Sequence, residues 1–136
     1  MRLVVDTNVL VSALLTRDGV SARFLAGLAN ERHVPLVDAR ILAEYRRVLA
    51  RPRFGLGPEV VAATLSSLEA AAVSIDAPRL PLRLPDPDDL PFLEVAVAGR
   101  AHALVTGNAR HFAPLQGAHT VRVASPREAL DLMNRE

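Results

Sequence analysis

The chain has 136 residues, half of them apolar, which suffices to bury the core of one domain but not of two, so we predict a single domain over residues 1–136. All 16 basic residues are arginine, and the formal net charge is only +1. The missing lysine excludes the usual P-loop, Schiff-base and aspartyl-phosphate mechanisms, and the missing cysteine excludes disulfides, thiol catalysis and thiolate metal sites.

The apolar runs of the sequence are short. The longest uncharged runs, such as residues 9–15, fall well below the roughly 20 residues that span a membrane. The N-terminus reaches the carboxylate of Asp6 after three apolar residues and so lacks the apolar core of a secretory signal. We therefore expect a cytoplasmic protein without membrane contact.

Short apolar strands alternate with helices in the first half of the sequence. The predicted elements are a strand at 3–5, a helix at 9–15, a helix at 21–31, a strand at 34–37, a helix from 38 that ends before 52, and a helix at 58–72. Ser21 and Asp38 stand where they could cap their helices, and Pro58 suits a first helical turn.

The second half begins with a proline-rich stretch. Five of the ten prolines lie between Asp76 and Pro91, which predicts an ordered, extended connection. The elements after it are a helix at 90–100, a strand at 103–106, a turn at 107–108, a strand at 120–123 and a helix from 125. Repeated strand–helix units predict an α/β fold with a parallel sheet, in which ligands bind at the carboxyl ends of the strands.

A carboxylate follows the first predicted strand. Asp6 comes directly after residues 3–5, so we expect it at the carboxyl edge of the sheet, where Thr7 and Asn8 add two further oxygen-bearing side chains. Aspartate is also a favoured cap for the helix that follows. Asp6 is thus a candidate site residue with an alternative role as a helix cap.

A second acidic group ends the proline-rich stretch. Asp86, Asp88 and Asp89 lie within four residues, and such concentrated charge is costly unless a cation or hydrogen bonds offset it. Asp89 could alternatively cap the next helix, because acids suit its positive end. We keep Asp89 and Asp86 as candidate metal ligands and interpret Asp88 as a solvated residue.

Two further oxygen donors come from other elements. Glu44 lies in the middle of the third predicted helix, near the edge of its apolar face, where it could instead pair with Arg40 or Arg47. Asn108 follows the strand at 103–106, where its amide oxygen could accept a metal or a water, or simply form a turn.

These oxygen donors suit a hard divalent cation. Mg²⁺ binds oxygen ligands and keeps several waters, and phosphodiester hydrolysis needs an activated water and neutralised phosphate charge. The four histidines lack the spacing and cysteine partners of a zinc site. Among them, His111 follows Asn108 closely and is the one that could belong to this site.

Arginines gather at the end of the third predicted helix and in the loop after it. They are Arg40, Arg46, Arg47, Arg51 and Arg53. Guanidinium groups bind phosphate oxygens well, so the last four, with Thr7 and Asn8, are our candidate RNA contacts. The alternative for each arginine is a solvated position with an ion pair to Asp38 or Glu44.

Four motifs, in this order, resemble the PIN domain family. They are Val4-Val5-Asp6-Thr7-Asn8-Val9-Leu10, Glu44 ahead of Val48-Leu49-Ala50-Arg51-Pro52-Arg53-Phe54, Asp86-Pro87-Asp88-Asp89 with Phe92-Leu93, and Leu104-Val105-Thr106-Gly107-Asn108 with His111-Phe112. The resemblance runs from Leu3 to Glu128. More narrowly, the sequence is similar to PIN-family toxins of bacterial toxin–antitoxin systems, related to VapC-like toxins.

This resemblance implies a three-layer α/β/α sandwich with a central parallel sheet. It implies a Mg²⁺- or Mn²⁺-dependent endoribonuclease that cleaves RNA, is often a homodimer and is inhibited by an antitoxin whose peptide enters the acidic site. The family's acids fall on Asp6, Glu44 and Asp89, and its fourth acidic position falls on Asn108, which keeps an oxygen but lacks the charge. Asp6 and Asp89 would ligate the metal directly, Glu44 and Asn108 directly or through water, and Asp86 is a further candidate ligand.

Two other functions are consistent with parts of the sequence. A catalytically silent PIN-like module that binds RNA or protein is suggested by Asn108, and Asp6, Glu44 and Asp89 argue against it. A metal-dependent phosphatase with a receiver-like fold is opposed by the missing lysine and by Asn8, where such phosphatases carry a second aspartate.

Overall fold

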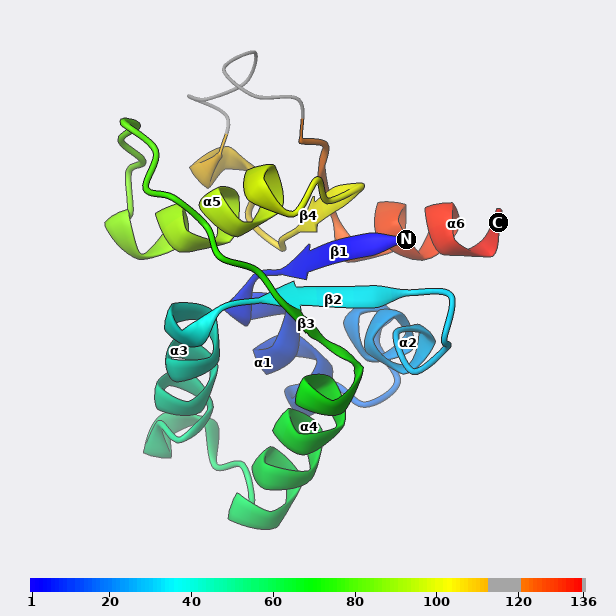
Figure 1. Cartoon of the computed structure of the whole chain (residues 1–136). Helices are drawn as coiled ribbons and strands as arrows, with labels where there is room; N and C mark the ends of the chain where they lie inside the picture. The colour runs from blue at the N-terminus through cyan, green and yellow to red at the C-terminus, as the bar shows by residue number, and fades with distance from the viewer. Residues whose placement is uncertain (113–120, 136) are drawn as a thin grey trace.

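Strands and helices alternate along the chain in the computed structural model, which describes residues 1–112 and 121–135 (Figure 1). In chain order the elements are β1 (Arg2–Val5), α1 (Thr7–Leu15), α2 (Val20–Gly27), β2 (Val34–Val37), α3 (Ala39–Leu49), α4 (Pro58–Ala71), β3 (Val73–Ser74), α5 (Leu90–Ala98), β4 (Ala103–Val105), β5 (Val123–Ala124) and α6 (Pro126–Asn134). The described residues also form the 3-10 turns η1 (Pro52–Phe54), η2 (Pro87–Asp89) and η3 (Ala109–His111).

The strands of the sheet are parallel and lie in the order β3-β2-β1-β4-β5. The chain moves outward from β1 to β2 and β3, and then returns to the other side of β1 to form β4. Leu3 pairs with Ala103 and Val5 with Val105, so β1 and β4 end side by side. A sheet whose strand order reverses in this way has a crevice at the carboxyl ends of those strands, where ligands bind.

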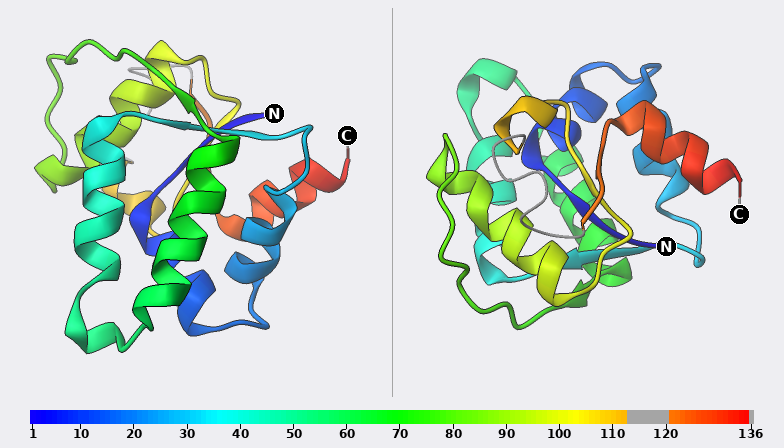
Figure 2. Two further views of the ribbon diagram at one scale, coloured as in Figure 1. Left: turned by 60° about the horizontal axis from the view of Figure 1, so that its bottom comes forward. Right: turned by 90° about the horizontal axis from the view of Figure 1, so that it is seen from above.

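Helices cover both faces of this sheet. Helices α1 to α4 lie on one face and α5 lies on the other, while α6 packs against α2 (Figures 1 and 2). The connections from β1 to β2 and from β2 to β3 move toward one edge of the sheet, and the connection from β3 to β4 moves toward the other edge. Because such crossovers are right-handed, the helices of the two groups lie on opposite faces. The predicted three-layer α/β/α sandwich with a central parallel sheet is confirmed.

The core forms where the central strands meet both helical layers. Leu3, Val4 and Val5 of β1 are at most 1% exposed, and β4 is buried throughout. A strand covered on both faces is a continuous apolar run, which is why these strands could be recognised in the sequence. The hydroxyl of the buried Tyr45 donates a hydrogen bond to Val5 O and so fixes α3 against the end of β1. Within the described residues, no helix has both the length and the apolar character needed to cross a membrane.

Two boundaries of α2 differ from the prediction. The helix begins after Gly19, and Ser21 lies buried within it rather than at its cap. It ends at Gly27, four residues before the predicted end. A Cβ atom at Gly27 would lie 2.5 Å from Met133 Cε, so a larger residue here would require the end of the Met133 side chain in α6 to move.

The outer strands were the least predictable. β3 was not predicted, because Val73 and Ser74 are both exposed and form no apolar run; the strand is extended by a 2.8 Å hydrogen bond from Ile75 N to Val37 O. The last strand, predicted at 120–123, is found at β5, and residue 120 lies outside the described residues.

The helix caps are only partly as predicted. Asp38 caps α3 through a 3.0 Å hydrogen bond from Ile41 N to its Oδ1. Ser125 and Glu128 cap α6 reciprocally, each side chain accepting from the backbone N–H of the other residue. The proline-rich stretch forms no helix or strand from residue 75 to residue 86, which confirms the extended connection.

Candidate active site

An open cleft of about 510 Å³ lies at the carboxyl edge of the sheet. Its acidic lining residues are Asp6, Glu44, Asp86, Asp88 and Asp89, and its arginines are Arg47, Arg51 and Arg53. A larger cavity of about 660 Å³, lined from α1, α2 and α4, has no carboxylate in its lining. We therefore place the candidate site in the cleft.

Asp6 ends β1 and enters the cleft as a buried carboxylate, 5% exposed. It occupies the N-cap position of α1, yet its side chain makes no capping hydrogen bond, so the helix-cap alternative is wrong. Its Oδ2 instead accepts a 2.8 Å hydrogen bond from Thr106 Oγ1. Burial raises the pKa of Asp6 to about 6, an effect opposed by the Thr106 hydrogen bond and reinforced by the nearby charge of Asp89.

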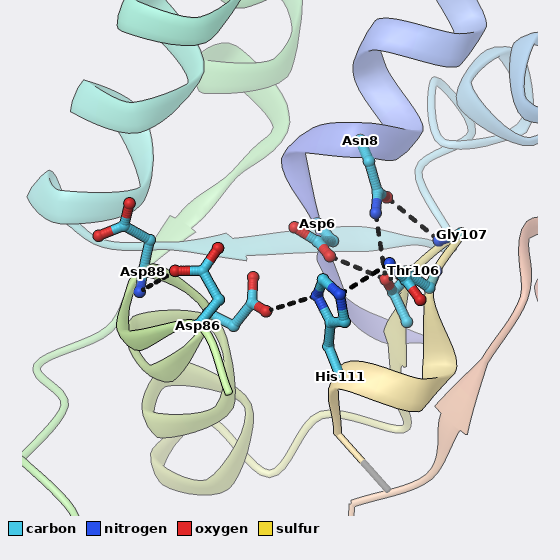
Figure 3. Close-up of polar contacts among 9 residues, drawn as sticks. Asp6, Asn8, Asp86, Asp88, Thr106, Gly107 and His111 are labelled. Carbon is cyan, nitrogen blue, oxygen red and sulfur yellow. Dashed lines mark hydrogen bonds and ion pairs between the residues drawn. The ribbon is translucent and has the colours of Figure 1, made fainter. Parts of the chain in front are cut away.

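Thr106 is a site residue that the sequence reasoning missed. It is 1% exposed, follows β4 directly, and accepts hydrogen bonds from Asn108 N at 3.0 Å and Asn8 Nδ2 at 3.5 Å (Figure 3). Asn8 Oδ1 in turn accepts from Gly107 N at 3.1 Å. The sequence signal was that Thr106 is a polar residue directly after an apolar strand. Because that strand pairs with β1, the residue after it lies beside Asp6.

Asp89 enters the cleft from the start of α5 and is 8% exposed. Its side chain makes no capping hydrogen bond, so its alternative role as a cap is also wrong. The exposed Asp86 performs that task for η2, where its Oδ1 accepts from Asp88 N at 3.0 Å. Burial raises the pKa of Asp89, a hydrogen bond from His111 lowers it, and the charge of Asp86 raises it.

His111 links two of the predicted site residues. Its Nδ1 lies 3.0 Å from Asp89 Oδ2, and its Nε2 lies 2.9 Å from Asn108 Nδ2. A neutral imidazole with its proton on Nδ1 satisfies both contacts, since Nδ1 then donates to the carboxylate while Nε2 accepts from the amide. The amide nitrogen of Asn108 is thus engaged by His111, whose ring also orients Asp89.

Glu44 reaches the cleft from the middle of α3, with a side chain 16% exposed. The buried Thr7 donates its hydroxyl hydrogen bond to Glu44 Oε2, and Arg47 Nη2 lies 3.6 Å from Glu44 Oε1. Burial raises the pKa of Glu44, the Thr7 hydrogen bond lowers it, and the charges of Asp6 and Asp88 raise it. Glu44 is therefore within the electrostatic field of Asp6, and its ion pair with Arg47 does not remove it from the site.

The oxygen donors of the cleft fit a hydrated Mg²⁺ or Mn²⁺ ion. Among the described residues, no three Asp, Glu or His side chains converge closely enough to hold a metal ion together. Mg²⁺ does not need three, because it usually binds through one or two carboxylates and keeps several waters. Asp6 and Asp89 are both buried, and each lies within a field of negative charge that a divalent cation would neutralise.

Three of the predicted RNA contacts form a basic part of the cleft lining. Arg47 belongs to α3, and Arg51 and Arg53 belong to the segment that follows it. Phe54 lies beside them, with the Arg53 guanidinium 4.9 Å from its ring centroid. Positive charge and one aromatic ring therefore border the acidic centre.

The other two arginines of this cluster point elsewhere. Arg46 lies outside the cleft lining and pairs with Glu69 of α4, which joins α3 to α4. Arg40 pairs with Asp38 and with Glu94 of α5, rather than with Glu44. The proposed RNA contact of Arg46 stays a prediction from the sequence.

Comparison with known proteins agrees with this fold. The sequence matches the PIN domain family over residues 2–110. The fold is similar to that of a chain in the crystal structure of VapBC2 from Rickettsia felis bound to a DNA fragment from their promoter, with a TM-score of 0.62 and 18% identity over 92% of this chain and 98% of that chain. No match was found among curated proteins. Since the family match spans most of the chain and includes β1, α3, α5 and β4, the chain belongs to the PIN domain family.

Proposed function

We propose that the protein is a Mg²⁺- or Mn²⁺-dependent endoribonuclease and the toxin of a type II toxin–antitoxin pair. The observation that carries this proposal is the pair of buried carboxylates, Asp6 and Asp89, which share one cleft and cap neither of their helices. Burying two carboxylates is costly even with their hydrogen bonds to Thr106 and His111, and a bound cation would offset that cost. Membership of the PIN domain family, whose proteins are typically nucleases, supports the same conclusion.

In this proposal each side chain of the cleft has a distinct task. Asp6 and Asp89 would bind the cation directly, and Glu44 and Asn108 would bind it directly or through water. The bound cation would supply water activation and charge neutralisation at the scissile phosphate. Thr106 orients Asp6 through its hydrogen bond to the carboxylate, as hydrogen-bonded partners of metal ligands commonly do.

The RNA would be held mainly through its phosphates. Arg47, Arg51 and Arg53 line the cleft with the acids, and arginine binds phosphate oxygens through paired N–H donors. Contacts of this kind position a strand without reading its bases. Thr7 and Asn8, also proposed as RNA contacts, line the same cleft and bond to Glu44 and Thr106.

The proposed partners are a cognate antitoxin and a second copy of the chain. The chain of similar fold belongs to VapBC2, which was crystallised bound to a DNA fragment from their promoter. This similarity to a chain of a VapBC2 structure supports an antitoxin partner for the present chain. An antitoxin peptide that entered the acidic cleft would block access to Asp6 and Asp89. Co-expression with the product of a small neighbouring reading frame would test this pairing, and analytical ultracentrifugation would test the dimer.

The nuclease activity is tested by incubating purified, antitoxin-free protein with a pool of structured and single-stranded RNA. The pool is incubated with Mg²⁺, with Mn²⁺ or with EDTA, beside an Asp6→Asn control. Cutting that needs the metal and is lost in the variant is the expected result. A folded protein that cuts nothing under any of these conditions would contradict the nuclease.

A catalytically silent PIN-like module remains the second candidate function. The observation that favours it is the contact between Asn108 Nδ2 and His111 Nε2, which engages the amide nitrogen of an uncharged side chain at the family's fourth acidic position. If this position limits catalysis, Asn108→Asp should raise Mn²⁺ affinity and RNA cleavage several-fold, because it adds a negative charge to those of the proposed ligands Asp6, Glu44 and Asp89. An inactive wild type whose Asn108→Asp variant is active would support the silent module.

A further inference from the structure

Glu94 is a buried charge in an otherwise apolar helix. It is 1% exposed and is the charged residue of α5, whose sequence is LPFLEVAVA. Its Oε1 lies 2.6 Å from Arg40 Nη1, and its Oε2 accepts a 2.6 Å hydrogen bond from Leu80 N. Both carboxylate oxygens are therefore engaged, one by α3 and one by the proline-rich connection.

Arg40 is in turn shared between two carboxylates. Its Nε donates a 2.9 Å hydrogen bond to Asp38 Oδ2, and its Nη2 lies 2.8 Å from the same oxygen. The Nη2 atom is shielded from solvent and has no well-aligned hydrogen bond, so its contact with Asp38 is mainly ionic. Because Asp38 caps α3, the guanidinium is anchored at the start of the helix that carries Glu44.

This ion pair joins the two elements that deliver carboxylates to the cleft. Arg40 precedes Glu44 by four residues, so both lie on the same face of α3, one turn apart. Glu94 lies in α5, five residues after Asp89, which immediately precedes the helix. The distance between Arg40 and Glu94 therefore constrains how far apart α3 and α5 hold Glu44 and Asp89.

Apolar packing does not fill the space between these elements near the site. A cavity of about 270 Å³ is lined from α3, η2 and α5, including Arg40, Glu44, Asp88 and Phe92. The rings of Tyr45 and Phe92 meet with centroids 6.2 Å apart, which provides an apolar contact between the helices. The ion pair is a second, directional contact beside the cavity.

The same carboxylate holds the segment that leads to the acidic turn. The proline-rich connection runs alongside α5 (Figure 2, right) and ends at Asp86, where η2 begins. The hydrogen bond from Leu80 N to Glu94 Oε2 fixes this connection against the helix. Glu94 therefore restrains η2 through α5 and through the preceding chain.

We propose that Arg40 and Glu94 are positioning residues, which lock α3 and the proline-rich connection to α5 and so set the separation of the Glu44 and Asp89 carboxylates. This inference rests on the proposed metal-dependent nuclease. It assigns Arg40 to the support of the acidic centre rather than to RNA. A purely structural ion pair would stabilise the fold without affecting metal affinity.

The test compares two variants with a matched control. Glu94→Gln keeps an acceptor for Leu80 N but loses the charge that pairs with Arg40. Arg40→Met/Glu94→Met removes both charges, so it leaves no buried charge at position 94 if the single variant unfolds, and Asp38 keeps its hydrogen bond from Ile41 N. Glu69→Gln is the control, because it breaks the Arg46–Glu69 ion pair between α3 and α4 outside the cleft.

Mn²⁺ affinity is measured by calorimetry on folded protein, and kcat and KM are measured with RNA. Both variants should bind Mn²⁺ at least about tenfold more weakly, with a lower kcat and an RNA KM within about twofold of wild type. The control should match wild type in Mn²⁺ affinity. Variants that lose thermal stability but keep wild-type Mn²⁺ affinity and kcat would overturn the positioning role and leave the nuclease intact.

The wild type separates the remaining outcomes. A wild type that binds Mn²⁺ but cuts no RNA would contradict the nuclease, and the Mn²⁺ affinities of the variants would still decide the positioning role. A wild type that neither binds Mn²⁺ nor cuts RNA would overturn both proposals.

Discussion

Thr106 Oγ1 donates a 2.8 Å hydrogen bond to Asp6 Oδ2, which joins the end of β4 to the end of β1. The two strands are neighbours at the point where the strand order of the sheet reverses. A buried hydroxyl that donates to a buried carboxylate stabilises its charged form and limits its rotation. The geometry of the acidic centre therefore depends on a residue that has no charge of its own.

Replacing this hydroxyl should weaken the site. In Thr106→Val, Asp6 loses a hydrogen bond that lowers its pKa, so that pKa should rise above about 6 and the affinity for Mn²⁺ at pH 7 should fall by about 10- to 100-fold. Calorimetric titration measures this change. Thr64→Val is the control, since Thr64 Oγ1 donates only to Val60 O within α4. Equal Mn²⁺ affinity in both variants would contradict the role of Thr106.

Asp6 should destabilise the metal-free fold at neutral pH. Its pKa is raised from 3.8 to about 6, so below pH 3.8 it is protonated in both folded and unfolded chains and costs nothing, and above pH 6 it is ionised in both and the full cost applies. At 1.36 kcal/mol per pKa unit this cost is about 3 kcal/mol. Asp6→Asn should therefore raise the free energy of unfolding at pH 7.5 by about 1–3 kcal/mol.

Urea unfolding with EDTA at several pH values measures this stabilisation. The difference between Asp6→Asn and wild type should shrink as the pH falls through 6. A variant less stable than wild type at pH 7.5 would mean that the Asp6 charge is already compensated in the metal-free protein.

The affinity for Mn²⁺ should rise with pH, whereas the stability of the metal-free fold should fall. Protons compete with the cation for Asp6, so Mn²⁺ affinity should be nearly constant above pH 7 and should fall by up to about tenfold for each unit below pH 6. Calorimetry between pH 5 and pH 8 measures this profile. Constant affinity over the whole range would show that Asp6 is not a ligand.

The arginines of the cleft should act on RNA binding and its salt dependence. Arg51→Met and Arg53→Met should each raise the RNA KM several-fold with little change in kcat, because their guanidinium groups line the cleft but are not among the proposed metal ligands. Each lost phosphate contact should reduce the slope of log affinity against log salt by about 0.7. Arg135→Met, at the end of α6, is the control, and a salt slope equal to that of the control would exclude phosphate contacts by Arg51 and Arg53.

Much of the fold was accessible from local sequence patterns. The strands β1, β2 and β4 are buried and apolar, so each appears as a short run of apolar residues bounded by polar ones. The acids Asp6 and Asp89 could be identified because each ends an apolar segment or begins a helix. β3 could not, since Val73 and Ser74 are exposed and their pairing with β2 is decided by tertiary structure.

The contacts within the site were less accessible, because they join residues distant in sequence. His111 and Asp89 are 22 residues apart, and Arg40 and Glu94 are 54 residues apart. In the sequence alone, Glu94 and Arg40 could each equally be an ordinary surface residue. Only the packing of α3 against α5 shows that these two charges are a pair.

The most direct test of the acidic centre is a crystal structure of the protein grown with Mn²⁺, with anomalous scattering used to locate the ion. We expect Mn²⁺ in the cleft, bound by the carboxylates of Asp6 and Asp89 with waters in its remaining positions. The absence of Mn²⁺ from this cleft in crystals at saturating concentration, or its binding elsewhere on the protein, would contradict the proposed metal-dependent site.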